Sequence, residues 1–204
     1  MQRRDGETFR KAIAIFKLHG GILKTTDAMR AGIHPRVLYA MRDAGLLEQL
    51  SRGLHRLTDM PSLGNPGLVS IALKVPSSVI CLISALAFHE LTIQVPHEVY
   101  LAMARGSRTP QLGCPPIRVF WFSSSVFTEG VEQHDMDGVW VRIYSPEKTL
   151  ADCFKYRNRI GLDTALEALK LYRQRKTIKA EELIRFARVC RVERVMRPYL
   201  EAVL

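Results

Sequence analysis

Basic and hydroxyl side chains recur at short spacing between residues 24 and 56, and these residue types bind nucleic acid. The guanidinium of Arg36 can make a forked contact to a guanine edge, and the hydroxyl of Tyr39 can reach a base edge or a phosphate. Lysine and threonine side chains are better suited to backbone phosphates, which position a protein without reading sequence. The predicted DNA-binding residues are Lys24, Thr25, Thr26, His34, Arg36, Tyr39, Arg42, Arg52 and Arg56.

Three short helices are expected to carry most of these side chains. Apolar residues at helical spacing predict a first helix over residues 7–18. A second helix is expected to begin at Thr25-Thr26, where a hydroxyl can cap it, and to stop at Gly32. His34-Pro35 begins the third helix, since proline is favoured at the first helical position, and Gly45 ends it.

The third helix is amphipathic and is followed by a hairpin. Its apolar positions predict one buried side, and Arg36, Tyr39, Ala40 and Asp43 lie on the opposite side, with Arg42 at the edge. Two strand-like runs, residues 46–50 and 54–57, flank a tight turn that carries Arg52. This order predicts a winged helix-turn-helix, whose second motif helix enters the major groove. The alternative is a three-helix packing unit in which the arginines are ordinary solvated charges.

The distribution of charge favours a polyanionic partner. The chain of 204 residues has a formal net charge of +10. Residues 1–60 contain 11 Lys and Arg against 6 Asp and Glu, residues 61–154 contain 6 against 8, and residues 155–204 contain 13 against 6. Both ends are therefore basic. Cations that neutralise phosphates release counterions, so double-stranded DNA is the favoured partner.

No membrane partner, cofactor or metal is expected. No apolar run approaches the roughly 20 residues that span a bilayer, and the first six residues lack a following apolar segment typical of a secretion signal. The protein is therefore expected in the cytoplasm. The cysteines are far apart, form no C-x-x-C pair and are expected to be reduced thiols: Cys81, Cys114, Cys153 and Cys190.

Turn-forming residues divide the chain into two expected domains. Residues 58–67 are rich in proline, glycine and asparagine and predict a linker. Residues 1–60 would then form the winged helix-turn-helix, and residues 61–204 a mixed domain. Strands are predicted at 99–103, 117–122 and 139–144, the last after an Asp137-Gly138 turn that indicates a hairpin, and 79–83 fits a strand or an apolar helix entry. One helix is predicted to begin at Ser145-Pro146, where the serine can cap it, and the other helices are predicted at 68–75, 84–91, 162–173, 181–190 and 192–203. The expected fold class is α+β, with a small sheet and several helices after the winged helix.

The sequence gives little support for catalysis, so no catalytic residue is predicted. It contains no P-loop, no G-x-G-x-x-G and no G-x-S-x-G. His89-Glu90 and His97-Glu98 begin like a zinc motif but lack the second histidine four residues on. A nuclease-like second domain is the enzymatic alternative. Its carboxylates would have to come from Glu98, Asp135, Asp137, Glu147 and Asp152.

Two charged or polar features of the second domain are expected to be structural. Lys148 and Asp152 lie four residues apart on a helix, where an ion pair contributes a few tenths of a kcal/mol. His89, at the end of an apolar helix, is expected to be a hydrogen-bonded core histidine.

Further arginines form a second candidate surface for anions or DNA. Arg105 and Arg108 lie in an expected exposed turn between strands, and Arg185 and Arg188 lie on a basic C-terminal helix. Spaced arginines on a helix are also typical of a solvated face.

Four segments resemble the AbiEi-type antitoxins, which are transcriptional regulators of bacterial phage-defence toxin–antitoxin operons. They are Gly45-Leu46-Leu47, the segment Arg52-Gly53-Leu54-His55-Arg56-Leu57, residues 83–89 (ISALAFH) and residues 144–152 (YSPEKTLAD). The last segment is the most specific, and the resemblance spans nearly the whole chain. The sequence departs from the family at two positions, with His55 where tyrosine is common and Glu90 where glycine is common.

The resemblance implies a repressor and antitoxin of a type IV toxin–antitoxin operon. Its N-terminal winged helix would bind inverted repeats in its own promoter, so two copies would sit on the DNA. Its C-terminal domain would neutralise a nucleotidyltransferase-like toxin, in that family without stable contact. A further alternative is a protein-interaction module that DNA binding localises.

Overall fold

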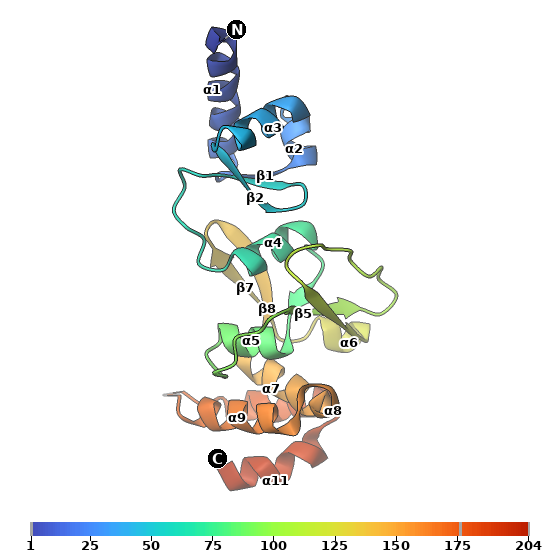
Figure 1. The fold of residues 1–204 in the computed structure, drawn as a ribbon. Helices are drawn as coiled ribbons and strands as arrows, with labels where there is room; N and C mark the ends of the chain where they lie inside the picture. The colour runs from blue at the N-terminus through green and yellow to red at the C-terminus, as the bar shows by residue number, and fades with distance from the viewer. Residues whose placement is uncertain (1, 176, 204) are drawn as a thin grey trace.

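The computed structural model describes residues 2–175 and 177–203 and shows an elongated molecule. A head, residues 2–57, lies at the N-terminal end (Figure 1). A body, residues 66–175 and 177–203, contains a second sheet, with a layer of helices at the far end of the molecule (Figure 1). Residues 58–65 form the junction segment between head and body. The fold class is α+β, as predicted.

The head contains three helices and a small antiparallel sheet in the order β1-β3-β2. Phe16, Leu38 and Met41 are fully buried at its centre. The first helix begins before the predicted Glu7, and the three-residue strand β1, which pairs with β3, was not predicted. The elements are α1 (Gln2–Leu18), β1 (Ile22–Lys24), α2 (Thr25–Arg30), α3 (Pro35–Asp43), β2 (Leu47–Ser51) and β3 (Leu54–Leu57).

The body is built on a mixed sheet in the order β6-β5-β4-β8-β7. The pairs β5·β6 and β4·β8 are parallel, and the others are antiparallel. The predicted Asp137-Gly138 turn joins β7 to β8, and Asp137 adopts a φ of 54° there. The bounds of strand β7 were not predicted, although the hairpin implied a strand before the turn, because its exposed polar residues hide the period of a strand. The strands are β4 (Val79–Ile80), β5 (Val99–Ala104), β6 (Ile117–Phe122), β7 (Val131–Met136) and β8 (Val139–Tyr144).

Helices flank this sheet and form the C-terminal layer. The 79–83 segment contains both the strand and the helix entry that its sequence allowed, and the helix after it ends at Phe88. Glu90 then adopts a φ of 57°, in the left-handed region that favours the glycine common there in the AbiEi family. The helices are α4 (Pro66–Lys74), α5 (Leu82–Phe88), α6 (Ser124–Phe127), α7 (Pro146–Lys155), α8 (Arg157–Ile160), α9 (Leu162–Arg173), α10 (Ala180–Val189) and α11 (Glu193–Val203). Within the described residues, no helix is long and apolar enough to cross a membrane.

Helix α7 lies in the body core and holds a buried ion pair. The Ser145 hydroxyl caps it by accepting from the Lys148 N–H at 3.3 Å, as predicted. Lys148 Nζ lies 2.5 Å from Asp152 Oδ2, and both side chains are fully buried. The same ammonium lies 4.2 Å from the centre of the Tyr144 ring. The prediction of a few tenths of a kcal/mol, which applies to an exposed ion pair, was therefore wrong for this pair. Both charges are removed from water, so removing one partner leaves the other charge buried without compensation.

Two other predictions about the body are confirmed. His89 is buried, and its Nε2 lies 2.7 Å from the Tyr144 carbonyl oxygen. The four cysteines are free thiols, of which Cys114 is exposed and Cys81, Cys153 and Cys190 are buried.

The junction segment, predicted as a linker, is tied to both sides. The Thr58 hydroxyl donates to the Gly45 carbonyl at 2.8 Å, and the Gly64 N–H donates to Asp137 Oδ2 at 3.1 Å. Leu54 of the head packs in one apolar cluster with Leu68 and Val69 of α4. The head sheet therefore has the head core on one face and α4 on the other.

Candidate nucleic-acid interface

Helix α3 presents a polar face to solvent and buries the other. Leu38 and Met41 are 1% and 0% exposed, whereas Tyr39 is 52% exposed and Arg36 is also exposed. His34 precedes the helix and caps it, because its Nδ1 accepts a hydrogen bond from the Arg36 N–H at 3.2 Å. The predicted face is confirmed, and His34 positions Arg36 through the backbone.

Charges on this face differ in how they are compensated. Arg42 Nη2 lies 2.9 Å from Asp43 Oδ1, and its guanidinium lies 5.3 Å from the centre of the Tyr39 ring. Arg36 has no acidic partner anywhere in the described part of the chain. An exposed guanidinium without a counter-charge on an ordered helix is free to meet an anion or a base edge. Arg36 is thus the strongest candidate for base contact.

The start of α2 is fastened to the wing, which is the turn at Arg52-Gly53 with strands β2 and β3. The Thr25 N–H donates to the Gly53 carbonyl at 2.9 Å, and Thr25 Oγ1 lies 3.1 Å from His55 Nε2. The predicted threonine cap is wrong: Lys24 is the cap residue, and it makes no capping side-chain bond. The histidine that replaces the family tyrosine holds the Thr25 hydroxyl instead. Burial, with nearby Arg42, lowers the pKa of His55.

Around this contact, three predicted side chains are available to phosphates. Thr26 is exposed on α2 next to the half-buried Thr25, and Lys24 is partly exposed. Arg52 is exposed at the wing tip, where Gly53 supplies a φ of 74° for the turn. Neither Lys24 nor Arg52 has an acidic partner among the described residues. Both cations therefore flank α3 uncompensated.

Arg56 is not available for DNA contact, which corrects the prediction. Its side chain is 6% exposed and pairs with Glu48 at 2.6 Å, and it also donates to the Pro61 carbonyl. Period-two alternation would leave one face of β3 in solvent, but all four of its residues are buried. Arg56 shares the face of Leu54, which the junction segment and α4 cover. Its charge joins the head to the junction segment.

The four arginines of the predicted second surface separate into two kinds. Arg185 pairs with Glu129 and Glu182, each at 2.9 Å, and Arg188 pairs with Glu193 at 3.1 Å. These ion pairs account for both arginines without a nucleic acid. Arg105 and Arg108 are exposed in the loop between β5 and β6, and they have no acidic partner in the described ranges.

The carboxylates considered for a nuclease serve other groups in the structure. Glu147 accepts the Tyr172 hydroxyl at 2.8 Å, and Asp152 accepts the Cys190 thiol at 3.2 Å besides pairing with Lys148. Asp135 and Asp137 accept backbone N–H groups, and Glu98 Oε1 lies 3.5 Å from Arg118 Nη1. The described residues bring no three metal-ligating side chains together.

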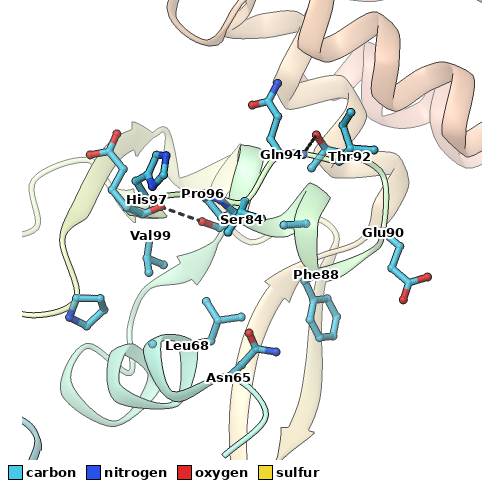
Figure 2. Close-up of a pocket in the computed structure, with 16 residues that line it drawn as sticks. Asn65, Leu68, Ser84, Phe88, Glu90, Thr92, Gln94, Pro96, His97 and Val99 are labelled. Atoms are coloured by element: carbon cyan, nitrogen blue, oxygen red, sulfur yellow. Dashed lines mark hydrogen bonds between the residues drawn. The ribbon is translucent and has the colours of Figure 1, made fainter.

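A hollow of about 690 Å³ in the body lies beside α5 and the 91–98 segment (Figure 2). Ser84 is its one buried hydroxyl, and that oxygen accepts from the Tyr100 N–H at 2.9 Å and donates to the Glu98 carbonyl. Figure 2 shows Glu90 directed away from the other labelled side chains. The Ser84 hydroxyl therefore holds the 91–98 segment against β5. Its hydrogen-bond partners are backbone groups and not a side chain that could act as a general base.

A known protein family matches the segment that contains the candidate interface. Residues 10–58 match the family described as "Transcriptional regulator, AbiEi antitoxin". The resemblance seen in the sequence is thereby confirmed over the head. The matched residues include all nine predicted DNA-binding positions, whereas the body lies outside the match. No curated protein matches the chain significantly.

Sequence reasoning missed one basic residue near this candidate interface. Lys74, in the last turn of α4, lies in a hollow beside Arg52. Its sequence context gives no signal, because a lysine that ends a helix is ordinary helix chemistry. Only the packing of α4 against the head places it there.

Proposed function

We propose that the protein is a DNA-binding transcriptional repressor that reads its own promoter through α3. The observation that carries the proposal is the exposed α3 face, on which Arg36 is uncompensated and Leu38 and Met41 are buried behind it. This face lies within the segment that matches a regulator family. A helix of this kind places its N-terminal residues against base edges in the major groove.

The interface residues divide by role under this proposal. Arg36 contacts a guanine, and Tyr39 with Arg42 contacts a base edge or a phosphate. Lys24, Thr26 and Arg52 contact phosphates on either side of the groove. His34 and Thr25 act by position, because the first caps α3 and the second fastens α2 to the wing.

The finer parts of the proposal follow from the family. The operator is an inverted repeat that takes two copies of the chain, with a winged-helix domain over residues 1–60 and an antitoxin domain over residues 61–204. The antitoxin domain neutralises a nucleotidyltransferase-like toxin of a type IV phage-defence operon in the cytoplasm. The chain itself acts without catalysis. Co-expression with the toxin of the same operon should restore growth, and unrelieved toxicity would contradict this part.

A gel-shift experiment tests the repressor. The full chain is titrated against its own upstream region at two salt concentrations, with an unrelated duplex as competitor. We expect retention that survives the competitor, because base contacts add to the salt-dependent phosphate term. If the unrelated duplex displaces the operator, the protein binds DNA through nonspecific charge alone, and the proposal is contradicted.

A further inference from the structure

A second hollow lies where the wing of the head meets the body. It has a volume of about 640 Å³ and is lined by Arg52 of the wing, Lys74 of α4 and residues 110–113 of the loop between β5 and β6. Its two charged lining residues are both cations, and they come from opposite sides of the junction. This arrangement exists only because the head and the body pack together.

The two cations are uncompensated where they meet. Neither Arg52 nor Lys74 forms an ion pair within the described residues. Burial and the nearby Arg52 charge both lower the pKa of Lys74, so both disfavour its ammonium form. An anion bound between the two would offset the repulsion and raise the pKa of Lys74.

Packed elements hold the backbone at both cations in position. Lys74 ends a helix whose Val69 and Ile71 are buried against the sheet and the head. Arg52 sits on a turn that the Thr25 N–H holds through the Gly53 carbonyl. The fixed backbone keeps both cations beside the hollow, which lowers the entropic cost of bringing them to an anion there.

We propose that this hollow binds a backbone phosphate of the operator duplex, beyond the base pairs that α3 reads. This inference rests on the proposed function and adds the body to the DNA interface. The wing supplies Arg52 and the body supplies Lys74, so the phosphate bridges head and body. The same loop carries the uncompensated Arg105 and Arg108, which gives those two residues a place beside the duplex.

The salt dependence of operator binding tests the proposal. Each phosphate contact adds about 0.9 to the slope of log affinity against log salt. We expect Lys74→Ala to lower that slope by about one, and to weaken operator and unrelated duplexes by the same factor. The charge-matched control is Lys170→Ala, since Lys170 is exposed on α9 in the C-terminal layer. It should leave the slope unchanged.

The outcomes separate this inference from the proposed function. If the wild-type chain does not prefer its operator, the proposed function fails. If the wild type prefers its operator and Lys74→Ala has the wild-type slope, only the phosphate site is overturned. A variant that weakens the operator alone would assign Lys74 to base recognition and also contradict the proposal.

Cys114 supplies a positional test of the same site. Its thiol is exposed and directly follows residues 110–113, which line the hollow, and the other three thiols are buried. A DNA-cleaving reagent attached to Cys114 should cut the duplex outside the α3 half-site, and absence of cleavage would contradict the proposal. The operator duplex should also slow thiol labelling at Cys114. Equal slowing by inorganic phosphate at the same concentration would assign the hollow to a small anion and overturn the duplex assignment.

Discussion

Replacing Lys148 with methionine should destabilise the protein more than any surface change of charge. The ammonium is fully buried 2.5 Å from Asp152 Oδ2 and lies over the Tyr144 and Phe122 rings. Methionine fills a similar volume but leaves the Asp152 carboxylate buried without its counter-charge. Breaking such a pair from one side costs about 3–5 kcal/mol. For a chain of this length that is a fall in melting temperature of about 10 °C.

The assay is urea denaturation, with calorimetry as a second readout. The control is Lys155→Met, which makes the same substitution on the same helix at an exposed position. It should change the free energy of unfolding by less than about 0.5 kcal/mol. The double variant Lys148→Met with Asp152→Leu should recover much of the loss, because it removes both charges. A Lys148→Met protein within about 1 kcal/mol of the wild type would refute this account of the core.

Three further predictions concern the core and its titrating groups. Gly130→Ala should lower the free energy of unfolding by about 2–4 kcal/mol, and Gly138→Ala should lower it by about 1–2 kcal/mol. Both glycines have a positive φ, but an added Cβ at Gly130 would lie 2.7 Å from a Lys148 carbon, whereas a Cβ at Gly138 would enter open space. Equal losses in urea denaturation would remove the packing argument. Burial lowers the pKa of His89, so its imidazole binds a proton less readily in the folded state than in the unfolded chain. The free energy of unfolding should therefore fall as the pH drops below about 6.5, and His89→Gln should make that fall smaller. One thiol, Cys114, should react in the native protein and all four after denaturation; rapid native labelling of a second thiol would contradict the buried positions.

The head could be predicted largely from its sequence because its signals are local. Proline after His34 and glycine at position 45 mark the ends of α3, and the apolar spacing between them gives its buried face. The hairpin turn is equally local. The start of α1 was missed because residues 2–6 are polar or glycine and extend no apolar period. The strand β1 was missed because its three residues carry no detectable period.

The failures in the head have a common physical origin in tertiary contacts. Thr25 has the right type and place for a cap, yet the wing binds its N–H and hydroxyl. Arg56 has the right type for a phosphate, yet α4 and the junction segment bury its strand on both faces. Lys74 gave no signal at all, because only the docking of the body brings it to Arg52.

In the body, element types were predicted better than environments. The cap at Ser145 and the hairpin at Asp137 follow from local chemistry and are confirmed. The Lys148 and Asp152 spacing fits an exposed helix as well as a buried one, and only the helices packed around α7 decide between them. Burial of charge therefore depends on neighbours that no local pattern contains.

The most direct test of the central claim compares the wild type with Arg36→Ala on the operator and on an unrelated duplex. Alanine keeps the Arg36 backbone N–H that His34 caps, so the helix should persist. The control is Arg173→Ala, an exposed arginine in the C-terminal layer. We predict a loss of about 1–3 kcal/mol on the operator with little change on the unrelated duplex, and no effect in the control. An Arg36→Ala protein that keeps the wild-type preference for its operator would contradict the claim that α3 reads the promoter.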